Sequence, residues 1–411
     1  MSNKRIFKNF GYLSVINFLT IGFPIIIYPY LNKVLGYDNF GLAIYYQTII
    51  GYFIVFVSYG FNITGTKLIS NLEGKEKNDI FWTLIIIRFL ISIFSCTICF
   101  AISFTLKKPL VFILMLPLLL NEVVFPQWYY QGTENMRNIT IINLITRILM
   151  IFLIILLVKN SNDLPIYTII YSLSPFVVSL ISFTILVNKD RIRYELDKKK
   201  FLLLSKRVLE KSNSVFIGTV VSVIKDKTNI IFIGLLIGNQ EVVIYDFISK
   251  VINVVSGFFS SFTNAQFPRF SKKYNKESFV KYTFLIFIAS IIIPFTGALF
   301  IYVIKYFNVA YLDIVYVPSF FGVYIILSFL IPMRGLAYQF GLCFLVSHGY
   351  NKEYTNSLML SFIVYIMFSG VFYLFKINNI YILILPLVFS VLVELLHRLY
   401  VSCYKVGLDG K

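Results

Sequence analysis

The chain has 411 residues, of which 58% are hydrophobic and 18% aromatic, and its mean hydropathy is +0.81. Only 14% of the residues are charged, well below the roughly 25% of soluble domains, so the composition excludes an ordinary soluble domain and indicates a polytopic membrane protein. The formal net charge of +18 is compatible with nucleic-acid binding, but most Lys and Arg lie in short connectors, as cytoplasmic anchoring requires.

Apolar runs of about 20 residues, long enough to cross a bilayer, define twelve candidate spans. They cover residues 10–31, 40–63, 80–105, 109–130, 139–158, 164–187, 213–237, 242–267, 279–304, 314–346, 355–375 and 379–401. Lys4, Arg5 and Lys8 precede the first run and no small-residue cleavage site follows it, so we expect a retained span rather than a removed signal peptide. The sequence therefore predicts an all-α integral membrane protein.

The longest and most basic connector, residues 188–212, separates six candidate spans from six others. We therefore expect an N-terminal six-helix bundle over residues 1–190, a basic cytoplasmic linker over 191–212, and a C-terminal six-helix bundle over 213–411. With the N-terminus inside, the loops on that side hold about 25 Lys and Arg. The opposite loops hold only Lys33, Lys107, Lys108, Lys159, Lys305 and Lys376. Both termini are therefore expected to be cytoplasmic.

Basic residues inside the predicted spans are the most informative feature, because a charge at the bilayer centre costs roughly 2.5–3.5 kcal/mol on insertion scales. They are Arg88, Arg147, Lys225, Lys227, Lys250 and Arg334. Such a surplus of cations predicts a cavity that receives an anionic group, and Arg can contact phosphate or pyrophosphate in a bidentate manner. We assign Arg88, Arg147, Lys225, Lys227 and Arg334 to this cavity as candidate substrate-binding residues.

Acidic neighbours offer another explanation for part of this charge. Asp246 and Lys250 are i, i+4 neighbours that can pair on one helix face, and so are Glu394 and Arg398. Asp226 lies between two lysines and either neutralises them or binds a coupling cation, for which H+ and Na+ are the candidates.

Glu122 and Arg88 also have alternatives to a role in the cavity. Glu122 is suited to pair with Arg88 or Arg147 across helices, and it is the other candidate for charge balance or coupling. The Arg88 side chain could instead snorkel toward the interface.

Aromatic and amide residues cluster in segments that suit sugar recognition. The candidates for sugar contacts are Tyr46, Gln47, Trp128 and Gln131, because rings stack on sugar faces and amides bond to hydroxyls. The alternative is an aromatic belt, since each segment lies near a predicted span end.

Signatures of other chemistries are weak or absent in the sequence. No G-x-x-x-x-G-K-[ST] motif for nucleotide binding occurs. His348 and His397 have no plausible metal or nucleophile partner in sequence, and Cys96 and Cys99 lie in an apolar run that favours helix packing over redox chemistry. We therefore expect no metal, no resident cofactor and no enzymatic activity.

Four segments resemble one family of transporters. They are Pro29–Gly36 with Phe40-Gly41; Tyr52-Phe53 with Tyr59–Asn62 and Thr66-Lys67; Gln127–Met136 with Arg147 downstream; and Phe267-Pro268-Arg269. In order and spacing the chain is similar to the Wzx-type polysaccharide flippases of the multidrug/oligosaccharidyl-lipid/polysaccharide exporter superfamily. It departs from them at Lys67, where the family often has Arg, and at Tyr130, where it often has Phe.

The resemblance implies twelve helices in two bundles around a central cationic cavity. It implies a cargo of undecaprenyl-pyrophosphate-linked oligosaccharide, an O-antigen or related repeat unit, moved from the cytoplasmic to the periplasmic leaflet of a bacterial inner membrane. Membrane lipids, a polysaccharide polymerase and a chain-length regulator are the implied partners, and nucleic acid is not. The alternatives are a multidrug cation antiporter of the same superfamily, a membrane glycan-modifying enzyme, and a structural partner in a glycan-export complex.

Overall fold

The computed structural model describes residues 23, 26–133, 135–190, 192–194, 196–272 and 274–406. These residues form helices and no strand, which confirms the predicted all-α fold. Ten helices in this part of the chain are long and apolar enough to cross a membrane. Contacts divide the chain into two compact units, unit 1 with Met1–Ile27 and Leu31–Lys227, and unit 2 with Tyr28–Tyr30 and Thr228–Lys411.

Two of the twelve predicted spans are not among these ten helices. Most of the first, residues 10–31, lies outside the described residues, as do Lys4, Arg5 and Lys8. The other, residues 213–237, lies in a long helix that carries Lys225, Asp226 and Lys227 in succession, and such a charge density is costly inside a bilayer. The predicted count of twelve is therefore not confirmed.

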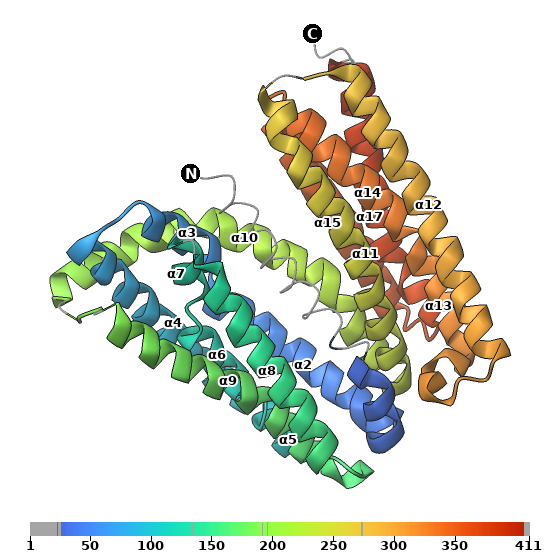
Figure 1. Ribbon diagram of the computed structural model, residues 1–411. Helices are drawn as coiled ribbons and strands as arrows, with labels where there is room; N and C mark the ends of the chain where they lie inside the picture. The colour runs from blue at the N-terminus through green and yellow to red at the C-terminus, as the bar shows by residue number, and fades with distance from the viewer. Residues whose placement is uncertain are drawn as a thin grey trace. The chain divides into compact units, whose positions relative to one another are not determined.

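Unit 1 is organised around a short central helix, α6. Its helices are α2 (Tyr37–Ser58), α3 (Phe61–Ser70), α4 (Gly74–Ser103), α5 (Pro109–Ile113), α6 (Pro117–Val124), α7 (Gln127–Gly132), α8 (Met136–Leu157), the turn η1 (Ser161–Asp163), α9 (Leu164–Lys189) and most of α10 (Lys198–Leu236). Helix α6 packs against α2, α4 and α9, and α8 lies alongside α9 (Figure 1). Residues 26–35 form a further helical segment.

Two helix breaks, where the backbone leaves the helical conformation, interrupt the apolar runs of unit 1. At the first, Tyr59 (φ 42°) and Gly60 (φ 73°) adopt left-handed conformations between α2 and α3. Gly60 suits this position because glycine has no Cβ to oppose a positive φ, and the Tyr59 ring stacks on Phe216 with centroids 4.3 Å apart. At the second, Phe125 and Pro126 separate α6 from α7. The predicted span 40–63 is therefore a bent pair of helices.

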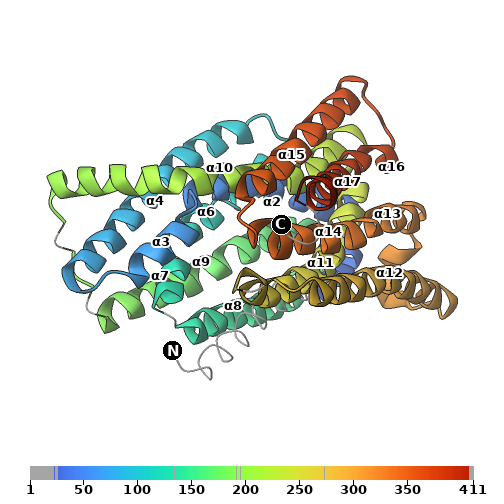
Figure 2. The ribbon, with the colours of Figure 1, turned by 90° about the horizontal axis from the view of Figure 1, so that it is seen from above.

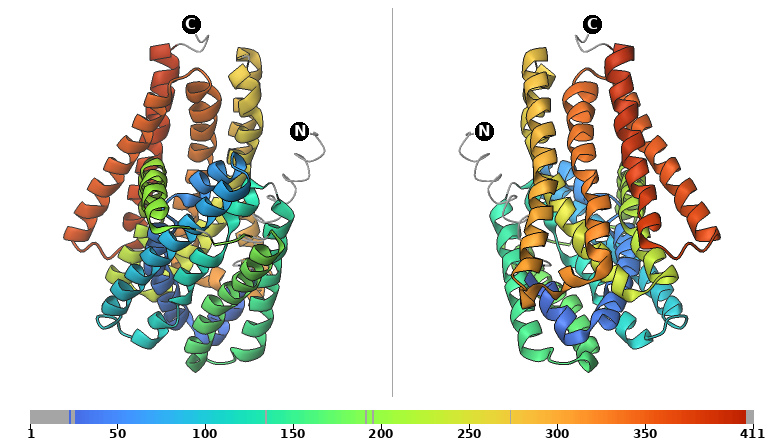
Figure 3. Two further views of the ribbon diagram at one scale, coloured as in Figure 1. Left: turned by 90° about the vertical axis from the view of Figure 1, so that its left-hand side faces the viewer. Right: turned by 90° about the vertical axis from the view of Figure 1, so that its right-hand side faces the viewer.

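Unit 2 is organised around α14. Its elements are the rest of α10, α11 (Asn239–Lys272), α12 (Lys276–Tyr306), η2 (Ala310–Tyr316), α13 (Pro318–Ser328), α14 (Leu330–Tyr338), the π-helical η3 (Gln339–Val346), α15 (Asn351–Leu374), α16 (Ile380–Leu383), α17 (Leu385–Tyr400) and the π-helical η4 (Val401–Val406). Helix α14 contacts α11, α12 and α17, and α17 in turn contacts α15 (Figure 2). Figure 3 shows α12 running alongside α13 and α14.

The segment predicted as a linker, residues 191–212, continues into a helix. Residues from Lys198 onward belong to α10, and the division between the units falls within this helix, after Lys227. Lys200 pairs with Asp79 of α4, and the Ser212 hydroxyl lies 2.6 Å from that of Thr64. These contacts explain why the first half of α10 packs with unit 1.

Candidate functional site

Arg88 of α4 lies inside unit 1 in a closed polar network. Its side chain is fully buried. Its Nη1 donates to the backbone carbonyl of Glu122 and its Nη2 to Asn62 Oδ1, each at 2.8 Å. The Glu122 carboxylate lies 3.7 Å from Nη1 and accepts a hydrogen bond of 3.3 Å from the Asn62 amide. A buried charge is tolerated only when it is paired and bonded. Nη1 and Nη2 meet that requirement, whereas Nε has no hydrogen-bond partner among the described residues.

The two helix breaks position the residues around Arg88. The left-handed turn before α3 brings Asn62 to α4. The break after α6 lets Trp128 of α7 lie close to the guanidinium, with 5.9 Å between the guanidinium carbon and the centroid of the Trp128 ring. Glu122 pairs with Arg88, the first of the two partners expected from the sequence. Because the guanidinium is fully enclosed, this structure favours a role for Arg88 in holding α3, α4 and α6 together.

Trp128 and Gln131, the candidate sugar contacts in the segment Gln127–Met136, both contact other residues of unit 1. Trp128 is fully buried, with its ring 5.4 Å from that of Phe81. Gln131 is partly exposed, and its side-chain oxygen accepts a hydrogen bond of 3.3 Å from Thr66. Glu134 of the same segment lies outside the described residues. Of this pair, only Gln131 presents surface to a ligand here.

Tyr46 and Gln47 of α2 differ in the same way. The Tyr46 ring is buried 5.4 Å from Phe112, and its hydroxyl accepts a hydrogen bond of 3.1 Å from the Lys108 amide. Gln47 is partly exposed and donates to the Tyr167 hydroxyl at 3.1 Å. Tyr46 therefore packs as a core residue, whereas Gln47 keeps an accessible edge.

Three consecutive charges of α10 lie where unit 1 ends within this helix. Lys225 and Lys227 are partly exposed and Asp226 is exposed. Lys227 lies over Gly51 of α2, where a Cβ would come within 2.7 Å of its Nζ. The absence of a side chain at Gly51 thus makes room for this ammonium group.

The two arginines outside the Arg88 network are partly exposed. Arg147 of α8 lies over the ring of Phe23, with 4.9 Å between the guanidinium carbon and the ring centroid. In unit 2, Arg334 of α14 donates to Asn253 Oδ1 of α11 at 2.5 Å. Neither contact encloses the guanidinium, so both arginines retain surface for an anionic ligand.

Unit 2 contains a triad of polar residues of which the sequence indicated only two. Asp246 and Lys250 of α11 form the expected i, i+4 ion pair. The buried Tyr28 hydroxyl donates to Asp246 Oδ2 at 2.5 Å and accepts a hydrogen bond from Lys250. Tyr28 is 218 residues from Asp246, so no local pattern could have indicated this contact.

The second i, i+4 pair joins three elements at one end of unit 2. Arg398 Nη2 lies 2.8 Å from Glu394, and Nη1 donates to the Ala337 carbonyl at 2.6 Å. Arg398 Nε donates to Ser357 Oγ at 2.9 Å. The side chain is almost fully buried, so this pair is structural, as its spacing indicated.

Comparison with known families decides where the chain belongs. Residues 6–274 match the profile of a family described as polysaccharide biosynthesis protein. The chain is a member of the polysaccharide biosynthesis protein family. This membership and the relatives below confirm the resemblance to polysaccharide flippases, and the ten candidate spans make this family member a multi-pass membrane protein.

Two curated relatives share much of their length with this family member. A protein of Escherichia coli (strain K12), named as a candidate O-antigen transporter, is 27% identical over 365 residues that cover 86% of each chain. A protein of Shigella dysenteriae with the same name is 23% identical over 275 residues, or 64% of this chain and 67% of that one.

Solved structures show the same fold at low sequence identity. The lipid II flippase MurJ, in an inward closed conformation, gives a TM-score of 0.72 at 13% identity, covering 96% of this chain and 87% of that one. An inward-facing multidrug resistance MATE family transporter gives a TM-score of 0.62 at 12% identity, covering 95% of each chain. This member of the polysaccharide biosynthesis protein family therefore has the fold of these transporters.

Proposed function

We propose that this chain is a flippase for a lipid-linked oligosaccharide and carries an O-antigen or related repeat unit across the bacterial inner membrane by alternating access. The cargo is undecaprenyl-pyrophosphate-linked, and both chain termini are cytoplasmic. The sugars and the pyrophosphate cannot cross hydrocarbon unaided, so the protein must shield them. Membership of the polysaccharide biosynthesis protein family and two relatives named for O-antigen transport support this proposal.

The observation that carries the proposal is the set of basic side chains that keep exposed surface within the spans predicted from the sequence. Arg147, Lys225, Lys227 and Arg334 are all partly exposed, in contrast to the enclosed Arg88. Cations at membrane depth mark a pathway for a compensating anion, and a pyrophosphate supplies such charge. We therefore assign cargo binding to these four residues, with Gln47 and Gln131 as sugar contacts.

A multidrug antiporter for cationic compounds is the main competing function. Such a site requires carboxylates that are available to a cation. Here Glu122 lies against Arg88, Asp246 against Lys250, and Glu394 against Arg398. These pairings favour an anionic cargo.

We propose that the membrane potential assists outward transport of the anionic cargo. An inside-negative potential favours outward movement of an anion, by about 2.3 kcal/mol per charge per 100 mV. The gain is smaller if cavity cations move with the cargo. Transport at an unchanged rate in vesicles whose potential has been collapsed would contradict a required role for the potential. H+ or Na+ coupling through Asp226 would instead make transport depend on the corresponding gradient.

The proposal is tested by complementation of a bacterial strain that lacks its polysaccharide flippase. We expect the wild-type chain to restore surface polysaccharide and Arg147→Ala or Arg334→Ala to reduce export about 10- to 100-fold, because a charge-assisted hydrogen bond contributes about 1.5–3 kcal/mol. Arg147→Lys should retain an intermediate level, since Lys keeps the charge but lacks the bidentate fork.

The matched control is Arg137→Ala, which removes an exposed arginine from the start of the same helix. Protein levels in the membrane must equal those of the wild type in every variant. Export at the wild-type level from Arg147→Ala and Arg334→Ala, as from the control Arg137→Ala, would argue against cargo binding by Arg147 and Arg334. Resistance to cationic drugs without restored polysaccharide would favour the antiporter.

A further inference from the structure

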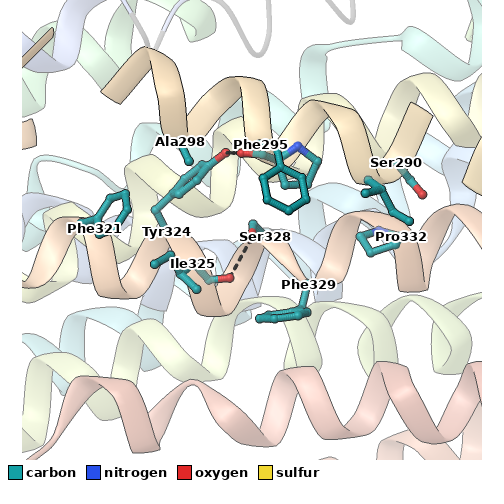
Figure 4. Close-up of a pocket in the computed structure, with 11 residues that line it drawn as sticks. Ser290, Phe295, Ala298, Phe321, Tyr324, Ile325, Ser328, Phe329 and Pro332 are labelled. Carbon is teal, nitrogen blue, oxygen red and sulfur yellow. Dashed lines mark hydrogen bonds between the residues drawn. The ribbon is translucent and has the colours of Figure 1, made fainter. Parts of the chain in front are cut away.

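A groove of about 450 Å³ runs along the outer surface of unit 2 between α12 and the consecutive helices α13 and α14. Figure 4 shows its lining: Phe295 and Ala298 come from α12, and Phe321, Ile325 and Phe329 face them from the other side. The α12 side extends from residue 290 to residue 298, which is about 12 Å of helix at 1.5 Å per residue. The groove therefore runs along about two turns of α12.

The polar atoms of this groove are turned away from a ligand. The Tyr324 hydroxyl donates to the Pro294 carbonyl at 2.8 Å, and the Ser328 hydroxyl donates to the Ile325 carbonyl at 2.7 Å (Figure 4). Tyr324 reaches this carbonyl because Gly297 has no side chain, and a Cβ there would lie 2.1 Å from the hydroxyl. The surface that remains is hydrocarbon and aromatic, which suits an apolar chain.

A basic residue lies beyond one end of the groove. Lys305, exposed in the last turn of α12, lies over the ring of Phe321 with its Nζ 6.0 Å from the ring centroid. Tyr302 and Tyr306 on the same turns are 67% and 74% exposed, as expected where a span meets the membrane–water interface. An apolar groove in the membrane thus ends beside an interfacial cation.

We infer that this groove binds the hydrocarbon chain of a polyprenyl phosphate lipid, with the phosphate at Lys305. The inference rests on the proposed function, because it names where the lipid part of the cargo or its carrier is held. The volume of about 450 Å³ has room for part of one hydrocarbon chain, and Lys305 beside Phe321 offers one cation to a phosphate at the end of that chain. A phospholipid would have to leave its second acyl chain outside the groove.

The test measures lipid bound to the purified full-length protein by native mass spectrometry, with undecaprenyl phosphate as the probe. Ala298→Trp fills the groove and should lower the bound fraction at least tenfold. The control, Leu299→Trp, adds the same ring at an adjacent position that is 63% exposed and outside the lining. Ile325→Trp fills the groove from the opposite wall, so the test does not depend on one variant that folds poorly.

A second pair of variants tests the phosphate contact. Lys305→Gln should weaken binding of undecaprenyl phosphate about fivefold, the effect of one interfacial cation on an anionic lipid. Lys376→Gln removes another exposed lysine of unit 2, away from the groove, and should have no effect. Equal binding by both groove-filling variants and the wild type would overturn the inference.

Competition distinguishes the lipid sources, and complementation separates the two proposals. Displacement of undecaprenyl phosphate by an equal amount of phosphatidylglycerol would show that the groove is an ordinary phospholipid site and would refute the inference. Restored export with no groove-dependent lipid binding would refute the groove and leave the flippase proposal intact. Groove-dependent binding by a wild-type chain that never restores export would support the groove and refute the proposed function.

Discussion

Replacement of Arg88 by Met is expected to destabilise unit 1 strongly. The substitution keeps a long side chain but removes two hydrogen bonds of 2.8 Å and an ion pair of 3.7 Å. Hydrogen bonds to charged groups contribute about 1.5–3 kcal/mol each, and loss of one partner of a buried ion pair costs about 3–5 kcal/mol. We therefore expect a loss of about 3–5 kcal/mol, because the largely buried Glu122 (17% exposed) would lie unpaired near an unbonded Asn62 oxygen.

The assay heats the detergent-solubilised protein and measures the fraction that stays monodisperse as a function of temperature. A double variant, Arg88→Met with Glu122→Met, should recover much of the stability because no unpaired charge remains. Loss of export without loss of stability in Arg88→Met would refute this reasoning and would place the guanidinium in contact with cargo.

Three smaller perturbations follow from the same packing. Gly341→Ala should cost about 1–3 kcal/mol by overpacking, because its Cβ would come within 2.7 Å of the nearly fully buried Arg398, and thermal unfolding measures this loss. Gly51→Ala would place a Cβ against the far end of the flexible Lys227 side chain. Because this end can move aside, thermal stability should not fall, whereas export should fall. Reduced stability would contradict the idea that the lysine is simply displaced. Tyr28→Phe removes one donor to the α11 carboxylate, and thermal unfolding should show a loss of about 1–3 kcal/mol; a variant as stable as the wild type would count against this contact.

Features set by nearby residues could be predicted from the sequence. The all-α membrane fold follows from the apolar runs, and the two i, i+4 pairs follow from helical periodicity, which places such residues on one face. Both pairs are present, Asp246 with Lys250 and Glu394 with Arg398. For Glu122 the sequence suggested Arg88 or Arg147 as a partner, and the structure has Arg88.

Features set by packing between distant segments could not be predicted. Periodicity places Arg88 on a helix face but does not say that a left-handed turn brings Asn62 to it. The contact of Lys227 with Gly51 depends on how α10 crosses α2. Apolar run lengths also do not reveal that α10 begins at Lys198, because residues 198–212 are too polar to register as a span. Whether the five candidate cations face one cavity stays a prediction.

The network around Arg88 has a consequence for how the chain is made. Asn62 precedes Arg88 in the chain, whereas Glu122 follows it by 34 residues. At about 5–20 residues per second, the ribosome needs about 2–7 s to supply the carboxylate. During that interval α4 holds a guanidinium whose counter-charge does not yet exist. The pairing of Arg88 thus waits for a helix that has not emerged, and a chain truncated before α6 should hold α4 in the membrane less firmly than the full chain does.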